Sequence, residues 1–224
     1  FADYFYFGGM GAYTDSDINW HNNPAKGWVE SGYAGLYFSA IGDMFYANMS
    51  VIAGWSHYNS RRYIDFPGVY EVPHETHGGA QLLSHIDTGI NLGVSGFTVR
   101  PFDSFDYISQ RENSYTETGA DVYNLHVAKS NAITARNELG LQFAGCLCLH
   151  SSRWTLSPKA SWVRNIRIKG SEFTCNFIDT DVTFISTGYF ANRSLFSAGA
   201  LLTGQMWDDR LSLELYYNGE FRHG

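Results

Sequence analysis

Histidines and acidic residues are the side chains of this sequence that could perform acid–base or metal chemistry. His74-Glu75-Thr76-His77 places two histidines three residues apart, whereas the zinc-binding helix of many hydrolases holds them four apart on one face. Pro73 and Gly78 flank this segment, which favours a loop with solvated side chains. Three further histidines with nearby acidic residues could form a general acid–base pair: His57, His85 and His126. The sequence contains no Gly-x-Ser-x-Gly motif, and we predict that the chain is not an enzyme and uses no cofactor or metal.

The three cysteines are Cys146, Cys148 and Cys175, and they are too few for a disulfide scaffold. Cys146 and Cys148 are two residues apart, so their thiols would lie on one face of a strand. Without further ligands this pair is only a weak indication of a metal site. We interpret all three cysteines as ordinary small residues.

Most other charged side chains alternate with apolar ones. Between positions 211 and 222 the apolar residues fall on odd numbers and the polar residues mainly on even numbers, and positions 136–143 repeat the pattern. Because successive side chains of a strand point to opposite faces, this period of two indicates strands with one polar and one apolar face. The polar face would carry Asp87, Arg100, Arg136, Glu138, Glu214, Glu220 and Arg222. The apolar face would carry Leu139, Leu141, Phe143, Leu211, Leu213 and Leu215.

Similar segments along the chain predict about nine strands, most of them longer than the five or six residues usual in soluble sheets. The links near 40–44 and 207–210 are short, whereas 60–79 and 170–181 are long and irregular. A run at 181–190 could be a further strand or part of a loop. Short links at one end of a sheet and long ones at the other are typical of a transmembrane β-barrel. No linker-like change of composition divides the chain, so we predict one domain over residues 1–224.

Composition also favours β-structure and limits the function. Charged and aromatic residues each make up 17% of the chain, and 23 residues are glycine. The net charge of −7 argues against a nucleic-acid partner, which would require a basic surface. No apolar run reaches the roughly 18 residues of a membrane helix. The sequence opens with Phe1 rather than Met, and we expect it to be a piece of a longer protein.

Two architectures share the alternating pattern. In a soluble β-sandwich the apolar face forms the core, whereas in an outer-membrane barrel it contacts lipid and the polar face lines the lumen. Three features favour the barrel: strands long enough for a tilted crossing of about 9–11 residues, aromatic residues near strand ends, and charged residues in mid-strand. We therefore predict an all-β, antiparallel transmembrane β-barrel.

Several motifs, taken in order along the chain, resemble the β-domain of autotransporters, the translocator unit of type V secretion. Phe5-Tyr6-Phe7-Gly8-Gly9-Met10-Gly11-Ala12-Tyr13 is similar to the family's glycine-rich third strand, and Ser31-Gly32-Tyr33-Ala34-Gly35-Leu36-Tyr37 to its fourth. Four further stretches are similar to later family segments: Val99-Arg100-Pro101-Phe102, Tyr115-Thr116-Glu117-Thr118-Gly119-Ala120, Arg136-Asn137-Glu138-Leu139-Gly140-Leu141 and Leu213-Glu214-Leu215-Tyr216-Tyr217-Asn218-Gly219-Glu220. The resemblance covers essentially the whole chain.

This resemblance implies a twelve-stranded barrel, of which the first two strands and the last one would be missing here because the chain was trimmed. It also implies a location in the bacterial outer membrane, contact with lipid, and export of an N-terminal passenger. Insertion by the outer-membrane barrel-assembly machinery follows from the resemblance as well. Two alternatives remain open at this point, a porin-like passive channel and a soluble carbohydrate-binding β-sandwich.

Overall fold

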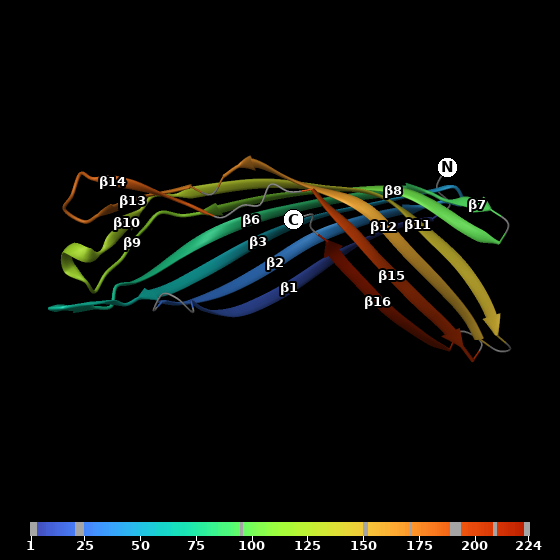
Figure 1. The fold of residues 1–224 in the computed structure, drawn as a ribbon, viewed down its shortest axis with the longest axis horizontal. Helices are drawn as coiled ribbons and strands as arrows, with labels where there is room; N and C mark the ends of the chain where they lie inside the picture. Colours follow the sequence, from blue (N-terminus) through green and yellow to red (C-terminus); the bar gives the residue numbers. More distant parts are fainter. Residues whose placement is uncertain are drawn as a thin grey trace.

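The computed structural model describes residues 4–20, 25–94, 96–149, 152–170, 172–188, 194–207 and 210–221. Nine long antiparallel strands follow one another in a single curled sheet, the main sheet (Figure 1). In order they are β1 (Tyr4–Asn19), β2 (Ala25–Ile41), β3 (Phe45–Arg62), β6 (His74–Ile90), β8 (Phe97–Glu112), β11 (Ser130–Leu149), β12 (Ser152–Lys169), β15 (Ser194–Met206) and β16 (Leu211–Phe221). The short strand β7 (Leu92–Val94) also pairs with β8. The predicted number of long strands is therefore confirmed.

Each long strand pairs with the next long strand along the chain, which makes the main sheet an up-and-down meander. The strands are 11 to 20 residues long, with β16 the shortest and β11 the longest. All of them reach the length that a tilted strand needs to cross a bilayer, about 9–11 residues. Among the described residues, no helix is long and apolar enough to span a membrane.

The links at one end of the main sheet are short, and three of those at the other end carry structure of their own. The link from β3 to β6 contains a hairpin of β4 (Ile64–Phe66) and β5 (Val69–Glu71). The later long links contain β9 (Tyr115–Thr116), β10 (Leu125–Val127), β13 (Glu172–Phe177) and β14 (Thr183–Thr187). These four strands pair in the order β14-β13-β10-β9 into a second sheet, here called the loop sheet. In Figure 1 it lies beyond the left-hand ends of the long strands.

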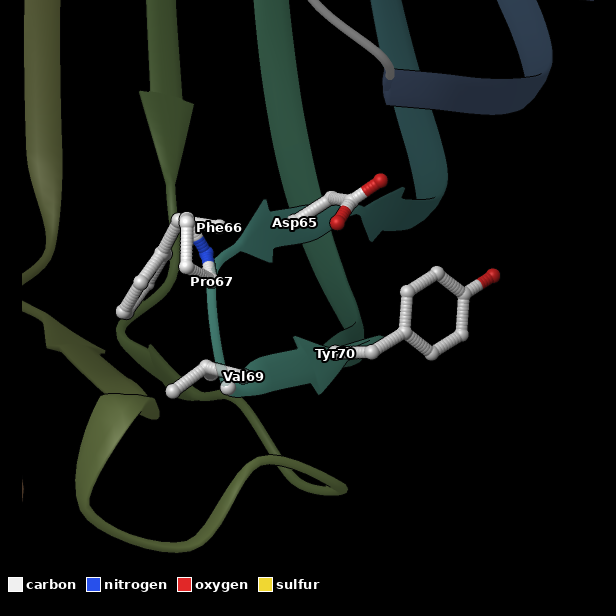
Figure 2. A pocket seen from close by; sticks show the side chains of 6 residues that line it. Asp65, Phe66, Pro67, Val69 and Tyr70 are labelled. Atoms are coloured by element: carbon white, nitrogen blue, oxygen red, sulfur yellow. The ribbon is translucent and has the colours of Figure 1, made fainter.

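The β4–β5 hairpin has its own alternation of side chains. Figure 2 shows Asp65 and Tyr70 pointing to one side of the hairpin and Phe66 and Val69 to the other. These residues line a hollow of about 660 Å³. The ring of Phe66 meets that of Tyr123 edge-on, with the centroids 6.0 Å apart, so the hairpin packs against the following long link.

Three expectations about loops are wrong. The segment from His74 to His77 is not a loop, because it forms the start of β6 and pairs with β3. Its side chains are not uniformly solvated either, since Glu75 is only 6% exposed. The stretch 170–181 is not irregular throughout, because β13 occupies part of it. Of the two possibilities for the run at 181–190, the strand is confirmed, because β14 lies within it and pairs with β13.

Three tyrosines of β2 and β3 lie over glycines of neighbouring strands. A Cβ atom built on Gly8 would lie 2.5 Å from the ring of Tyr37, one on Gly54 2.6 Å from Tyr33, and one on Gly89 2.5 Å from Tyr46. In each case the two residues face each other in the strand register. The glycine therefore makes room for the ring, and the ring covers the bare backbone of the next strand.

We expect Gly54→Ala to destabilise the domain by about 1–2 kcal/mol, because the added methyl group forces the Tyr33 ring out of its position. Gly32→Ala is the matched control in β2, since a Cβ there would meet nothing within 4 Å. Reversible unfolding in detergent micelles measures both changes. Equal stability losses for the two variants would show that the close Tyr33 contact is not what excludes a side chain at position 54.

Candidate functional site: the charged concave face

One ion pair identifies the concave face of the main sheet. The strands β11 and β16 are separated by β12 and β15, so a flat sheet would hold them about 14 Å apart. Arg136 of β11 and Glu220 of β16 nevertheless form an ion pair, in which the guanidinium Nη2 donates to Oε1. Side chains can meet across two intervening strands only on the face toward which the sheet curls. Arg136 and Glu220 therefore lie on the concave face.

Glu138 is the centre of a charged cluster on this face. Its Oε1 accepts hydrogen bonds from Lys159 Nζ at 3.0 Å and from Ser161 Oγ at 2.7 Å. Arg136 Nη2 lies 4.0 Å from its other carboxylate oxygen. The Glu138 side chain is only 14% exposed, and it lies between Arg136 of its own strand and Lys159 of β12. Arg136, Glu138, Lys159 and Glu220 thus form one chain of alternating charges, here called the Glu138 cluster.

A second polar cluster surrounds Asp87 and Arg100. The two Asp87 carboxylate oxygens accept hydrogen bonds from Tyr46 Oη at 3.1 Å and Asn48 Nδ2 at 3.2 Å. Arg100 lies over the Tyr46 ring, 4.9 Å from its centroid, and its Nε donates to Asn91 Oδ1 at 2.7 Å. Tyr46 therefore contacts both charges, Arg100 through its ring and Asp87 through its hydroxyl group.

The pairing register places both clusters on the same face. Glu138 lies opposite Ser104, and Ser104 lies opposite Asp87. Arg100 also donates from Nη1 to Gln142 of β11 at 3.5 Å. Polar contacts therefore run along the concave face from β3 to β16.

His85 and Asp106 form a further pair in this row, with His85 Nδ1 and Asp106 Oδ1 2.7 Å apart. Their side chains are 42% and 32% exposed, so both are open to the concave side. Among the described residues, no group of three or more His, Cys, Asp or Glu side chains is arranged to hold a metal ion.

The structure brings most of the predicted polar set together, but not all of it. Asp87 and Arg100 meet in one cluster, and Arg136, Glu138 and Glu220 meet in the other. Glu214 is exposed and lies opposite Thr203 at the short-link end of β16. Arg222 lies outside the described residues.

The predicted apolar set lies on the opposite, convex face. These side chains occupy the alternate positions of β11 and β16, and each is between 41% and 55% exposed. They are Leu139, Leu141, Phe143, Leu211, Leu213 and Leu215. Such a large exposed apolar surface is unusual for a soluble domain and marks contact with another apolar medium or partner.

Sequence reasoning missed Lys159, Ser161 and Tyr46 as members of the site. Lys159 and Ser161 stand on β12, where polar residues occupy the odd positions and Pro158 and Trp162 belong to the apolar even positions, until Val163 and Arg164 reverse the pattern. The alternation around Lys159 and Ser161 is therefore a signal that could have placed both on the polar face, and the register, which sets Ser161 opposite Gly140, gives the same face. Tyr46 has an amphipathic side chain, so composition alone does not assign it to a polar face.

The chain matches the family model of the autotransporter beta-domain over residues 1–218. Its structure is similar to the crystal structure of the beta domain of the Bordetella autotransporter BrkA, with a TM-score of 0.53 and 13% sequence identity. The superposed part covers 98% of this chain and 83% of that one. At this identity the likeness shows the fold. No curated protein sequence is significantly similar to the chain.

A curled antiparallel sheet of long strands, with a polar concave face and an apolar convex one, defines the wall of an outer-membrane β-barrel. The chain belongs to the autotransporter beta-domain family. It is an outer-membrane translocator domain that anchors a passenger and serves its export to the bacterial surface. The soluble sandwich alternative is therefore wrong.

Proposed function

We propose that the concave face lines the aqueous passage for the passenger and that the convex face contacts lipid. The observation that carries the proposal is the Arg136–Glu220 ion pair, because it joins two distant strands on the concave side. Charged groups inside hydrocarbon without a partner would be too costly. The same parity that turns Glu138 inward turns Leu139 and Leu141 outward.

The charged residues of the concave face have two different roles. The residues of the Glu138 cluster neutralise one another's charges, and their contacts hold β11, β12 and β16 in a curled arrangement. Glu214 is exposed on the same face and is available to an extended polypeptide in the passage. The domain performs no covalent chemistry, acts as one unit over residues 1–224, and is inserted by the outer-membrane barrel-assembly machinery.

Thiol labelling of two adjacent positions on β16 tests the assignment of the faces. We expect Glu214→Cys to react with a small hydrophilic thiol reagent and Leu215→Cys to react with a hydrophobic, membrane-restricted reagent. Cys146, Cys148 and Cys175 are first replaced by serine in the full-length protein. Glu214 and Leu215 are both exposed, so a difference in reagent preference reports the medium rather than burial. The reverse pattern would show that the faces have been assigned the wrong way round.

A further inference from the structure

Three basic side chains lie next to one another at the long-link end of the main sheet. Lys26 of β2 pairs with Arg61 of β3, and Arg61 pairs with His74 of β6. Residues that lie directly opposite each other in a sheet point to the same face, so the three side chains form one row across three strands. All three are exposed. This group is here called the basic row.

Strand parity places the basic row on the convex face. Asp87 of the concave face lies opposite Asn48 of β3, so the even-numbered side chains of β3 point to the concave side. Arg61 is odd-numbered, and the register of β3 with β6 is continuous from Phe45 to Arg61. Because successive side chains of a strand alternate between the faces, Arg61 and the rest of the basic row point to the convex side.

A second row of side chains lies beside the basic row on the same face. Trp28 of β2 lies opposite Asn59 of β3, and Asn59 lies opposite Thr76 of β6. The Arg61 guanidinium lies over the Trp28 ring, 5.3 Å from its centroid, and this cation–π contact restricts its position. Thr76 Oγ1 donates to Asn59 Oδ1 at 2.6 Å, so the amide N–H groups, rather than the oxygen, are what Asn59 offers to a ligand.

The basic row has no counter-charge of its own. Among the described residues, none of its three side chains forms an ion pair. On the same face of β1, Asp17 lies opposite Trp28 rather than opposite Lys26. Like charges directly opposite each other in a sheet are destabilising, so the Lys26–Arg61 pair does not serve the stability of the fold. Such a conflict with local stability is typical of a functional site, and an anion between the two cations resolves it.

Exposed aromatic residues give the height of the basic row above the membrane. Tyr13 and Trp55 both lie opposite Gly32 on the convex face, and they are 67% and 61% exposed. Aromatic residues of this kind mark the membrane interface. Arg61 follows Trp55 by six residues, which is about 20 Å along the strand and about 15 Å along the membrane normal at a tilt of about 40°. The polar layer of a bilayer is only about 5–7 Å thick on each side, so the basic row lies beyond the phosphates of an ordinary phospholipid.

We propose that the basic row binds the phosphorylated sugar head group of a glycolipid in the outer leaflet. A phosphate lies between Lys26 and Arg61, where the guanidinium donates to two of its oxygens, and the Asn59 amide donates to a neighbouring sugar hydroxyl. The long links of an outer-membrane barrel are extracellular, so this end of the convex face borders the outer leaflet. The inference rests on the proposed contact of the convex face with lipid, but binding of the head group can be measured without a membrane.

Calorimetric titration with a soluble head group provides the first test. The probe is the fully deacylated oligosaccharide of lipopolysaccharide with its core phosphates, added to the full-length protein in detergent micelles. We expect saturable binding, which Lys26→Gln and Arg61→Gln each weaken about tenfold, whereas Arg61→Lys, which keeps the charge, retains most of it. Removal of the phosphates from the oligosaccharide should abolish binding.

The matched control is Arg164→Gln, which removes a single exposed cation from the same face. Arg164 of β12 lies opposite Asn137 and Ser194, far from the basic row, so its loss should leave the affinity unchanged. No binding of the phosphorylated oligosaccharide, equal binding of the dephosphorylated one, or an equal loss in Arg164→Gln would each overturn the proposal.

Native mass spectrometry of the full-length protein provides the second test and identifies the source of the phosphate. We expect adducts of intact lipopolysaccharide that the double variant Lys26→Gln/Arg61→Gln loses, whereas adducts of phosphatidylglycerol should be equal in the two proteins. Loss of both kinds of adduct would show that the row binds any lipid phosphate and would overturn the assignment to a sugar head group. Thiol labelling on β16 tests the faces separately, so absent glycolipid binding with the expected labelling would overturn this inference alone and leave the proposed passage standing.

Discussion

Leu141→Arg is expected to destabilise the inserted domain by about 2–4 kcal/mol, the cost of an arginine on the lipid face near the bilayer midplane. Leu141 lies near the middle of the 20-residue strand β11 and is 45% exposed on the convex face. Its neighbours in the register are Pro101 and Ala160, so no acidic group stands directly beside the new charge. Reversible unfolding of the full-length protein in lipid bilayers measures the loss.

Two controls separate this effect from a general sensitivity to arginine. Ser104→Arg places the same side chain in mid-strand on the concave face, opposite Asp87 and Glu138, where it should cost far less. Leu213→Arg lies on the convex face but only two residues from the start of β16, and near the interface the cost falls to about 0–1 kcal/mol. If Leu141→Arg were as mild as Ser104→Arg, the convex face would not be in contact with hydrocarbon.

Glu138→Ala is expected to cost about 2–3 kcal/mol of stability, because hydrogen bonds to charged groups are worth more than neutral ones and their loss leaves buried partners unpaired. The substitution removes the acceptor of Lys159 and Ser161 and leaves Lys159 and Arg136 as neighbouring cations without the intervening anion. Because Glu138 is only 14% exposed, water compensates little for the loss. Unfolding of the full-length protein in detergent measures it.

Glu214→Ala is the matched control, since Glu214 is an exposed carboxylate on the same face. Its effect should stay within about 0.5 kcal/mol, as for other surface positions. A combined variant Glu138→Ala/Lys159→Ala should lose less than the sum of the two single losses, because the residues act on one interaction. Strict additivity would mean that the Glu138–Lys159 pair contributes nothing to stability.

The alternation of side chains was sufficient to predict the number of long strands and to assign Glu138 and Leu139 to opposite faces of the sheet. Parity is a local property, so eight consecutive residues reveal it. The partners of Glu138 were beyond this reasoning, because Lys159 and Ser161 meet it only through the register of β11 with β12. Glu220 lies 84 residues from Arg136 in the chain, and their contact depends on the curl of the whole sheet.

Proline and glycine, which usually interrupt regular secondary structure, caused the main error in the predicted elements. Pro73 and Gly78 favour a loop locally, yet β6 begins at His74 and runs through Gly78. Pairing with β3 satisfies its backbone, and Gly79 lets the ring of Tyr58 approach to 3.0 Å from the position of a Cβ. Tertiary pairing thus overrides a local preference. The same pairing converts His77 from a predicted solvated residue into one that is stacked between Tyr58 and Tyr115.

The tyrosine-over-glycine contacts also determine how precisely neighbouring strands are aligned. A slip of one residue between strands would exchange the polar and apolar faces and is prevented by the alternation itself. A slip of two residues preserves both faces, so the alternation does not oppose it. Such a slip would move Tyr33 from Gly54 to Ile52 or Ser56, where a side chain would collide with the ring. The contacts at Gly8, Gly54 and Gly89 therefore favour the native register of β1, β2, β3 and β6 over registers shifted by two residues, which the alternation of side chains alone would allow.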